Sequence, residues 1–89
     1  MTNSIYTNEM LALRSWLKQE REARNLSMRA LAERMDKPHS FIQKVEQGER
    51  RLDVVEYVWY CHTLGIDPQI GVELIQNELP KENNSISST

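Results

Sequence analysis

The chain has 89 residues, with 13 acidic and 11 basic side chains, a formal net charge of −2 and one cysteine. This length suffices for one small domain with a single modest core. The sequence has neither an apolar stretch of about 18 residues nor a charged-then-apolar N-terminus ending in small residues, which argues against a membrane span and a signal peptide. We therefore expect a cytoplasmic protein, and the lone Cys61, which has no internal disulfide partner, agrees with a reducing compartment.

Apolar residues recur at helical spacing along the chain, and no alternating run indicates a strand. The sequence therefore predicts an all-α domain over residues 8–79, between disordered segments at 1–7 and 80–89. The first helix begins at Thr7 or Asn8, either of which is a good N-cap, and runs to about Asn25. Its inward-facing residues are expected to be Leu13, Trp16 and Leu17.

Two short helices joined by a tight turn are predicted between Ser27 and Arg51. Ser27 can cap the first of them. The inward face of that helix carries Leu31, Ala32 and Met35. The Asp-Lys-Pro tripeptide at 36–38 interrupts it, because proline disfavours the helical region for the residue before it. Proline suits the first turn of a new helix, so the next helix should begin near Pro38.

The second helix of this pair has one apolar and one polar face. Phe41, Ile42 and Val45 form the apolar strip, and Gly48 ends the helix in a left-handed conformation. The polar face carries side chains that can hydrogen-bond base edges and phosphates: His39, Ser40, Gln43, Lys44 and Gln47. Because a helix of this width fits the major groove, the pair indicates a DNA-binding protein.

A fourth helix is predicted to start with a capping box, in which Asp53 precedes Glu56 by three residues, and to stop at Gly65. One stripe of this helix falls at i, i+3, i+4 and i+7 spacing and is expected to be core: Val54, Tyr57, Val58, Cys61 and Leu64.

A fifth helix is predicted to open at Asp67-Pro68 and to end at Pro80. Its apolar residues are Ile70, Leu74, Ile75 and Leu79. Val55 and Trp59 form a second apolar line on the fourth helix, which leaves surplus apolar surface on a small chain. Two interpretations stay open. In one, Val55 and Trp59 complete a monomer core against the fifth helix; in the other, a homodimer interface is formed by Val55, Trp59, Ile70 and Leu74.

Residues 13–74 resemble the helix-turn-helix family of phage repressors and Cro proteins, whose large bacterial branch is the xenobiotic-response-element (XRE) family. The resemblance rests on Ala32 where the two helices cross, on Ile42 and Val45 in the recognition-helix core, and on the helix end Val-Glu-Gln-Gly-Glu-Arg at 45–50. It implies a compact five-helix bundle of the lambda-repressor-like type, with the helix-turn-helix formed by helices 2 and 3.

The resemblance also implies a structural ion pair between an arginine of the first helix and the glutamate before the glycine, which are Arg21 and Glu46 here. The chain departs from the family pattern in the turn. Asp36 stands where glycine is usual, and Pro38 stands where Ser or Thr usually caps the recognition helix. Asp tolerates positive φ better than most residues and proline suits a helix start, so both departures are compatible with the fold.

The negative net charge is unusual for a DNA-binding domain, but its distribution is uneven. Residues 14–51 carry ten Lys and Arg against six acids, a local charge of +4, while the rest of the chain carries −6. A basic half can face phosphate while an acidic half faces protein or water. The alternative, that these charges only solvate helix surfaces, stays open for the first helix.

We expect four side chains to read base edges: His39, Ser40, Gln43 and Lys44. Glutamine can pair with adenine and lysine with guanine. Contacts to the DNA backbone are assigned to Ser27, Arg29, Phe41, Gln47, Arg50 and Arg51. Arg29 is included because Met28 occupies a position where the family often has a DNA-contacting glutamine. Phe41 suits either a core position or contact with a thymine methyl group.

The predicted function is repression of transcription by a homodimer on a pseudo-palindromic operator in double-stranded DNA. One rival is an antitoxin that binds a partner toxin through its acidic fourth and fifth helices or its tail. A weaker rival is a fold that has lost DNA binding and serves only assembly. Cys61 and His62 point about 100° apart on a helix, and no nucleophile has a recognisable base partner, so no metal, cofactor or enzyme activity is expected.

Overall fold

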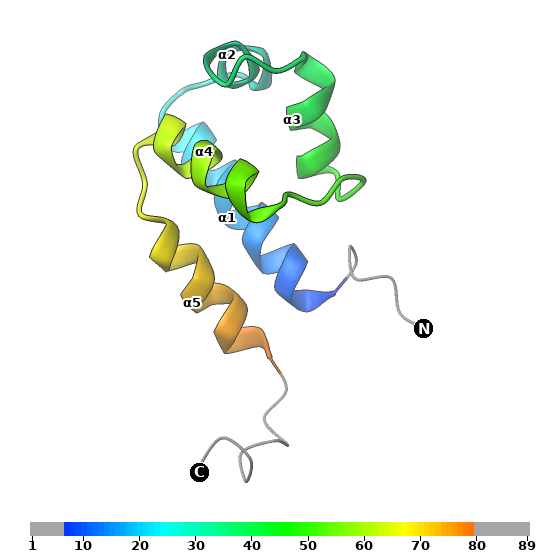
Figure 1. Ribbon diagram of the computed structural model, residues 1–89, viewed down its shortest axis with the longest axis vertical. Coiled ribbons are helices and arrows are strands. Elements are labelled where there is room, and N and C mark those ends of the chain that lie inside the picture. The colour runs from blue at the N-terminus through cyan, green and yellow to red at the C-terminus, as the bar shows by residue number, and fades with distance from the viewer. Residues whose placement is uncertain (1–6, 80–89) are drawn as a thin grey trace, which may run out of the picture.

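The computed structural model describes residues 7–79, which form five α-helices and no strand, as predicted. They are α1 (Asn8–Ala23), α2 (Met28–Arg34), α3 (His39–Glu46), α4 (Val54–Leu64) and α5 (Pro68–Glu78). Figure 1 shows α2 and α3 at one end of the molecule and α5 at the other, where it packs against α1. The segments expected to be disordered, and the expected helix end at Pro80, lie outside the described residues, apart from Thr7.

Four of the five helices begin at a side-chain cap of the predicted kind. Thr7 and Ser27 accept hydrogen bonds from the amides three residues on, at 3.3 and 3.0 Å, and Asp67 accepts from the amide two residues on, at 2.9 Å. Asp53 and Glu56 form both bonds of a capping box, at 2.7 and 3.0 Å. The starts of α1, α2, α4 and α5 are therefore set by local sequence.

The turn between α2 and α3 contains a left-handed residue, Asp36, with φ 57°. Pro38 occupies the N-cap of α3 without a side-chain hydrogen bond, so the helix begins one residue later than expected. Gly48 follows α3 with φ 79°, as predicted. Asn25 is also left-handed, with φ 56°, and for this reason α1 ends at Ala23 rather than at Asn25.

The hydrophobic core lies where the first four helices meet. Its fully buried large side chains are Leu17, Leu31, Ile42, Tyr60 and Cys61. The expected core stripe of α4 is wrong in part, because Val54 and Val58 are 77% and 47% exposed and Tyr60 is buried instead. Since α4 is apolar around most of its circumference, two stripes satisfy helical spacing, and packing selects the one that contains Tyr57, Tyr60, Cys61 and Leu64.

Helix α5 lies close to Tyr57 and Trp16 at Gly71. The Tyr57 hydroxyl donates a hydrogen bond to the Pro68 carbonyl oxygen at 2.6 Å, which ties α4 to the start of α5. A Cβ at position 71 would overlap this hydroxyl and lie 2.7 Å from Cζ3 of Trp16. Glycine is therefore needed here to allow the helices to approach, a role that the sequence pattern did not indicate.

Candidate nucleic-acid interface

Helix α3 turns its apolar side into the core and its polar side to solvent. It buries Phe41, Ile42 and Val45. Of the residues on this helix and its C-cap that we expected to contact DNA, Ser40, Lys44 and Gln47 are exposed, and His39 and Gln43 are half-buried. The Nδ1 atom of His39 is buried and has no hydrogen-bond partner within residues 7–79. The most exposed polar ridge of α3 therefore consists of Ser40, Lys44 and Gln47.

The inner side of α3 is anchored to α1 by the Arg21–Glu46 pair that the family resemblance implies. Arg21 Nε and Nη2 donate to the two carboxylate oxygens of Glu46 at 2.6 and 3.0 Å, and Nη1 donates to the Leu26 carbonyl oxygen at 2.7 Å. The Arg21 and Glu46 side chains are 9% and 6% exposed. The hydrogen bond to Glu46 raises the pKa of Arg21, and the two parallel N–H···O bonds have the geometry of a charge-assisted pair.

Phe41 is a core residue, 6% exposed, which favours the core position of the two that the sequence left open. Its ring supports two cations at the surface. The Lys37 ammonium lies 5.3 Å from the ring centroid, and the guanidinium carbon of Arg50 lies 4.7 Å from it. Cation–π attraction is favourable at both distances. The phenyl ring thus links the turn before α3 to the loop after it.

A bidentate ion pair fixes Arg50, which follows α3. Its Nη1 and Nη2 donate to Oε1 and Oε2 of Glu56 at 2.9 and 2.8 Å, and Nη1 also donates to the Arg51 carbonyl oxygen. The hydrogen bond from Arg50 is the main cause that lowers the pKa of Glu56 to about 2. From sequence we identified Glu56 only as a capping residue, because pairing across a loop has no signal in helical spacing.

The remaining residues assigned to the DNA backbone are Ser27, Arg29 and Arg51, and all three are exposed. Ser27 precedes α2, where its side chain is engaged as the N-cap. Arg29 lies in the first turn of α2, and Arg51 lies in the loop between α3 and α4. These positions are on the segments that flank α3 along the chain.

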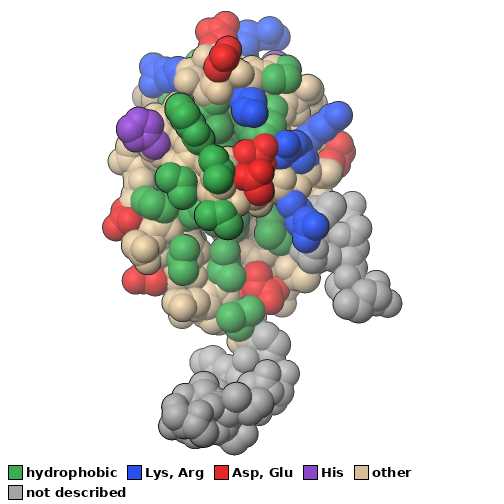
Figure 2. Space-filling model, in the orientation of Figure 1, with side chains coloured by type: hydrophobic (Ala, Val, Ile, Leu, Met, Phe, Trp, Pro, Cys, Tyr) green, Lys and Arg blue, Asp and Glu red, His purple; other side chains and the backbone are tan. Residues whose placement is uncertain are grey.

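Helices α4 and α5 expose a set of large apolar side chains, which we call the α4–α5 apolar surface: Val54, Val55, Val58, Trp59, Ile70 and Val72. Figure 2 shows apolar side chains gathered over the middle and lower parts of one face, below a group of basic side chains. Val55 and Trp59 are 66% and 56% exposed, so the interpretation in which they complete a monomer core is wrong. Leu74, also expected at a dimer interface, is half-buried.

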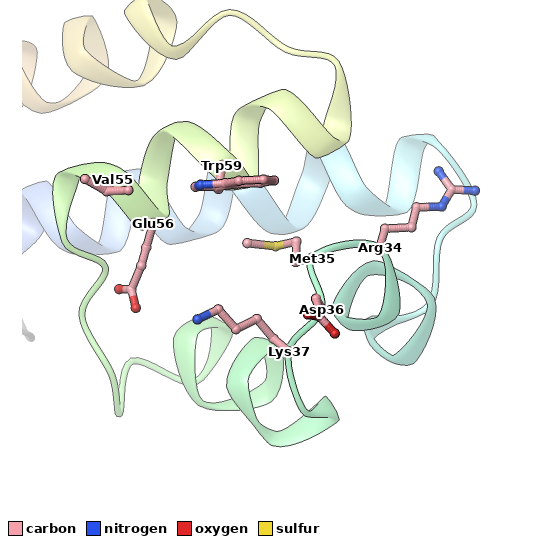
Figure 3. A pocket seen from close by; sticks show the side chains of 7 residues that line it. All are labelled: Arg34, Met35, Asp36, Lys37, Val55, Glu56 and Trp59. Carbon is pink, nitrogen blue, oxygen red and sulfur yellow. The ribbon is translucent and has the colours of Figure 1, made fainter.

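A pocket of about 550 Å³ lies between the α2–α3 turn and α4. Figure 3 shows Trp59 above Met35 and the Lys37 amine pointing toward the Glu56 carboxylate. The other lining residues are Arg34, Asp36 and Val55. The α4–α5 apolar surface therefore adjoins the turn of the helix-turn-helix.

Across residues 7–79, no group of three or more His, Cys, Asp and Glu side chains is placed to hold a metal ion. The same residues include no helix that is long and apolar enough to span a bilayer. Cys61 is buried, and burial raises the pKa of its thiol, which disfavours the reactive thiolate.

A family model described as Helix-turn-helix (HTH_3) matches residues 17–70. Among solved structures, an XRE-family like protein from Pseudomonas syringae pv. tomato str. DC3000 is 35% identical, with 81% of this chain and 88% of that chain covered and a TM-score of 0.73. The clp gene regulator ClgR from C. glutamicum is 19% identical, with 81% and 94% covered and a TM-score of 0.69, which supports the fold. No curated protein matches. The chain therefore belongs to the Cro/C1-type helix-turn-helix family, the XRE family of DNA-binding transcriptional regulators.

Proposed function

We propose that this protein represses transcription by binding a pseudo-palindromic operator as a homodimer, with α3 of each copy in the major groove. The observation that carries the proposal is the exposed polar ridge of α3, formed by Ser40, Lys44 and Gln47, on a helix whose other side is anchored in the core. A rigidly held helix with outward polar side chains suits base reading, because a bound protein must hold these groups at fixed positions in the groove.

Gln43 and Lys44 are the leading base readers in this proposal. Glutamine can form two hydrogen bonds with adenine, and lysine can donate to O6 and N7 of guanine. His39 and Ser40 lie in the first turn of α3, where side chains reach base edges or phosphate. The proposed contacts to the DNA backbone come from Ser27, Arg29, Gln47, Arg50 and Arg51.

The dimer is proposed to form through Val55, Trp59, Ile70 and Leu74. The exposed fractions of Val55, Trp59 and Ile70, which are 66%, 56% and 45%, leave apolar surface that a second copy can cover. Two-fold symmetry would repeat α3 on the second copy and place the half-sites about one DNA turn, or roughly 34 Å, apart. Occupancy of a promoter by such a dimer is sufficient for repression.

Fluorescence anisotropy tests DNA binding with the duplex upstream of the protein's own gene and a scrambled duplex, each at two salt concentrations. We expect tight, salt-sensitive binding to the upstream duplex and weaker binding to the scrambled one. Lys44→Ala should weaken binding to the upstream duplex by about 1–3 kcal/mol and change scrambled-duplex binding much less. Lys18→Ala, which removes an exposed lysine from α1, is the matched control.

Each outcome of this experiment has a distinct meaning. Equal losses on both duplexes for Lys44→Ala would reject Lys44 as a base reader. Equal, salt-sensitive binding of the wild type to both duplexes would place the operator elsewhere in the genome. No binding of the wild type at either salt concentration would reject the proposed function.

Sedimentation equilibrium tests the dimer. Trp59→Asp should shift the protein toward monomer, because it places a charge within the proposed apolar interface. Leu11→Asp is the matched control, since Leu11 is 49% exposed on α1 and lies outside the proposed interface. A wild-type protein that stays monomeric at all concentrations would reject the dimer and favour the antitoxin alternative, in which a partner toxin covers α4 and α5.

A further inference from the structure

Three cations and a hydroxyl surround a shallow cleft at the side of α3. The cleft has a volume of about 290 Å³ and is lined by Lys37, Pro38, Ser40, Phe41, Lys44 and Arg50. These residues come from the turn before α3, from α3 itself and from the loop after it. The family resemblance assigned no role to Lys37, because the cleft exists only where these three segments meet in the fold.

Phe41 holds two of these cations near each other. The Lys37 ammonium lies 5.3 Å from the ring centroid, and the guanidinium carbon of Arg50 lies 4.7 Å from it. The two cations can therefore be no farther apart than the sum of these distances. The ring is 6% exposed and packed in the core, so it cannot move aside. Arg50 is further fixed by its two hydrogen bonds to Glu56. Arg50 is therefore positioned before any ligand arrives, and Lys37 lies over the same ring.

The negative charge next to the cleft is already engaged. Both oxygens of Glu56 accept hydrogen bonds from Arg50, and Oε1 also accepts one from the Asp53 amide. Within residues 7–79, neither Lys37 nor Lys44 forms an ion pair. The Arg50–Glu56 pair is neutral overall and Glu56 also attracts Lys37, so the positive charge that remains around the cleft comes from Lys37 and Lys44. The cleft thus carries a surplus of positive charge that favours an anionic ligand.

We propose that this cleft binds a backbone phosphate of the DNA in whose major groove α3 lies, with Lys37 as a phosphate contact that positions the protein. This inference rests on the proposed function. A phosphodiester carries one negative charge and two acceptor oxygens, which match the Lys37 ammonium, the Ser40 hydroxyl and the Arg50 guanidinium. Because a phosphate looks the same beside every base pair, this contact adds affinity without adding sequence preference.

The test is the salt dependence of binding, measured by fluorescence anisotropy on the upstream and scrambled duplexes. The wild type, Lys37→Gln, Lys37→Arg and the control Lys18→Gln are compared over a series of salt concentrations. Removal of one phosphate-binding charge should reduce the slope of log affinity against log salt by about 0.9. We expect Lys37→Gln to reduce the slope by that amount per bound copy on both duplexes. Lys37→Arg, which keeps the charge, and Lys18→Gln should both retain the wild-type slope.

Several outcomes would overturn the proposal. An unchanged slope for Lys37→Gln, while the wild type binds the upstream duplex tightly, would reject the phosphate site and leave the proposed function intact. A reduction confined to the upstream duplex would make Lys37 a base reader instead. No salt-sensitive binding by the wild type would reject both proposals.

A second measurement separates DNA phosphate from free phosphate. The melting temperatures of the wild type and Lys37→Gln are compared in inorganic phosphate and in chloride at equal ionic strength. If Lys37→Gln reduces the DNA slope, a phosphate-specific stabilisation that it also removes supports the proposal, because the same cleft then binds free phosphate and DNA phosphate. A phosphate-specific stabilisation that Lys37→Gln removes, together with an unchanged DNA slope, would show a site for free anions and overturn the assignment to DNA.

Discussion

Two arginine–glutamate pairs flank α3 with nearly the same hydrogen-bond geometry and very different burial. Arg21 and Glu46, on the core side, have side chains that are 9% and 6% exposed. Arg50 and Glu56, on the solvent side, have side chains that are 40% and 16% exposed. Both pairs are bidentate, so geometry alone does not distinguish them.

Burial decides what each pair contributes. If one member of the inner pair is removed, the other stays buried and keeps its full desolvation penalty without the attraction that offset it. Each residue of the inner pair therefore stabilises the fold by compensating the charge of the other. An exposed charge is partly solvated by water, so the outer pair adds little to stability. Its main effect is geometric, because it holds a cation in a defined place beside α3. The inner pair therefore supports the fold, and the outer pair supports the surface that we propose meets DNA.

The largest expected effect is that of Arg21→Met, which leaves the Glu46 carboxylate buried without its ion partner. We expect a loss of about 3–5 kcal/mol in the free energy of unfolding, measured by urea denaturation. The double variant Arg21→Met/Glu46→Leu should recover most of this loss, since an apolar pair of similar size carries no desolvation penalty. If the single and double variants were equally destabilised, the loss would come from packing rather than from an unpaired charge.

Glu56→Gln should cost about 1 kcal/mol or less in the same measurement, because it removes one charge of a partly exposed ion pair, while glutamine can still accept the hydrogen bond from the Asp53 amide. Glu20→Gln is a matched control, since Glu20 pairs with Arg24 at 2.6 Å on the surface of α1 and has no capping role. This control should cost about 0.3–0.5 kcal/mol. If Glu56→Gln lowered the free energy of unfolding as much as Arg21→Met does, exposure to solvent would not explain how much each ion pair contributes to stability.

Acid should weaken the outer pair. The pKa of Glu56 is lowered from an ordinary value of 4.5 to about 2, so the carboxylate is ionised more readily in the folded protein than in the unfolded chain. Its contribution is fully present above pH 4.5 and is lost as the pH falls toward 2. The stability difference between the wild type and Glu56→Gln should therefore shrink between pH 6 and about pH 3. A constant difference would mean that Arg50 does not stabilise the ionised carboxylate.

The smallest expected effect is that of a substitution at Tyr60, which lies near the inner pair. Burial is the main cause that raises the pKa of Tyr60, and the negative charge of Glu46 raises it further. Its hydroxyl is buried and has no hydrogen-bond partner in the described residues. Tyr60→Phe removes a polar group whose burial is uncompensated, so we expect stabilisation of less than about 1 kcal/mol. Thermal unfolding monitored by circular dichroism measures this change. Destabilisation by more than this amount would indicate that a bound water satisfies the hydroxyl.

Features that depend on neighbouring residues were predicted well from the sequence. The capping box at Asp53 and Glu56 and the left-handed Gly48 were expected, and both are present. Their physical basis is local, because caps and turns satisfy backbone groups only a few residues away. Val54 and Val58 were misplaced because an almost uniformly apolar helix does not show which side faces the core.

Features formed between distant segments were not predicted from residue spacing, and the one that was expected, the Arg21–Glu46 pair, came from the family resemblance. The cleft at Lys37 forms where the turn before α3 and the loop after it both contact the Phe41 ring. The spacing of residues along the sequence does not predict that these two segments contact the same ring. Phe41 itself suited two environments from sequence alone, and only packing assigned it to the core. The polar face of α3 was predictable because it follows directly from helical periodicity.

The close approach at Gly71 also affects how far apart two recognition helices could be held. In the proposed dimer, α4 and α5 form the joint between the copies, and a side chain at position 71 would push α5 away from Tyr57 and Trp16. Any such displacement would be carried to α3 of each copy as a change in the span between them. A glycine far from DNA would in this way help to set the number of base pairs that separate the two halves of the operator.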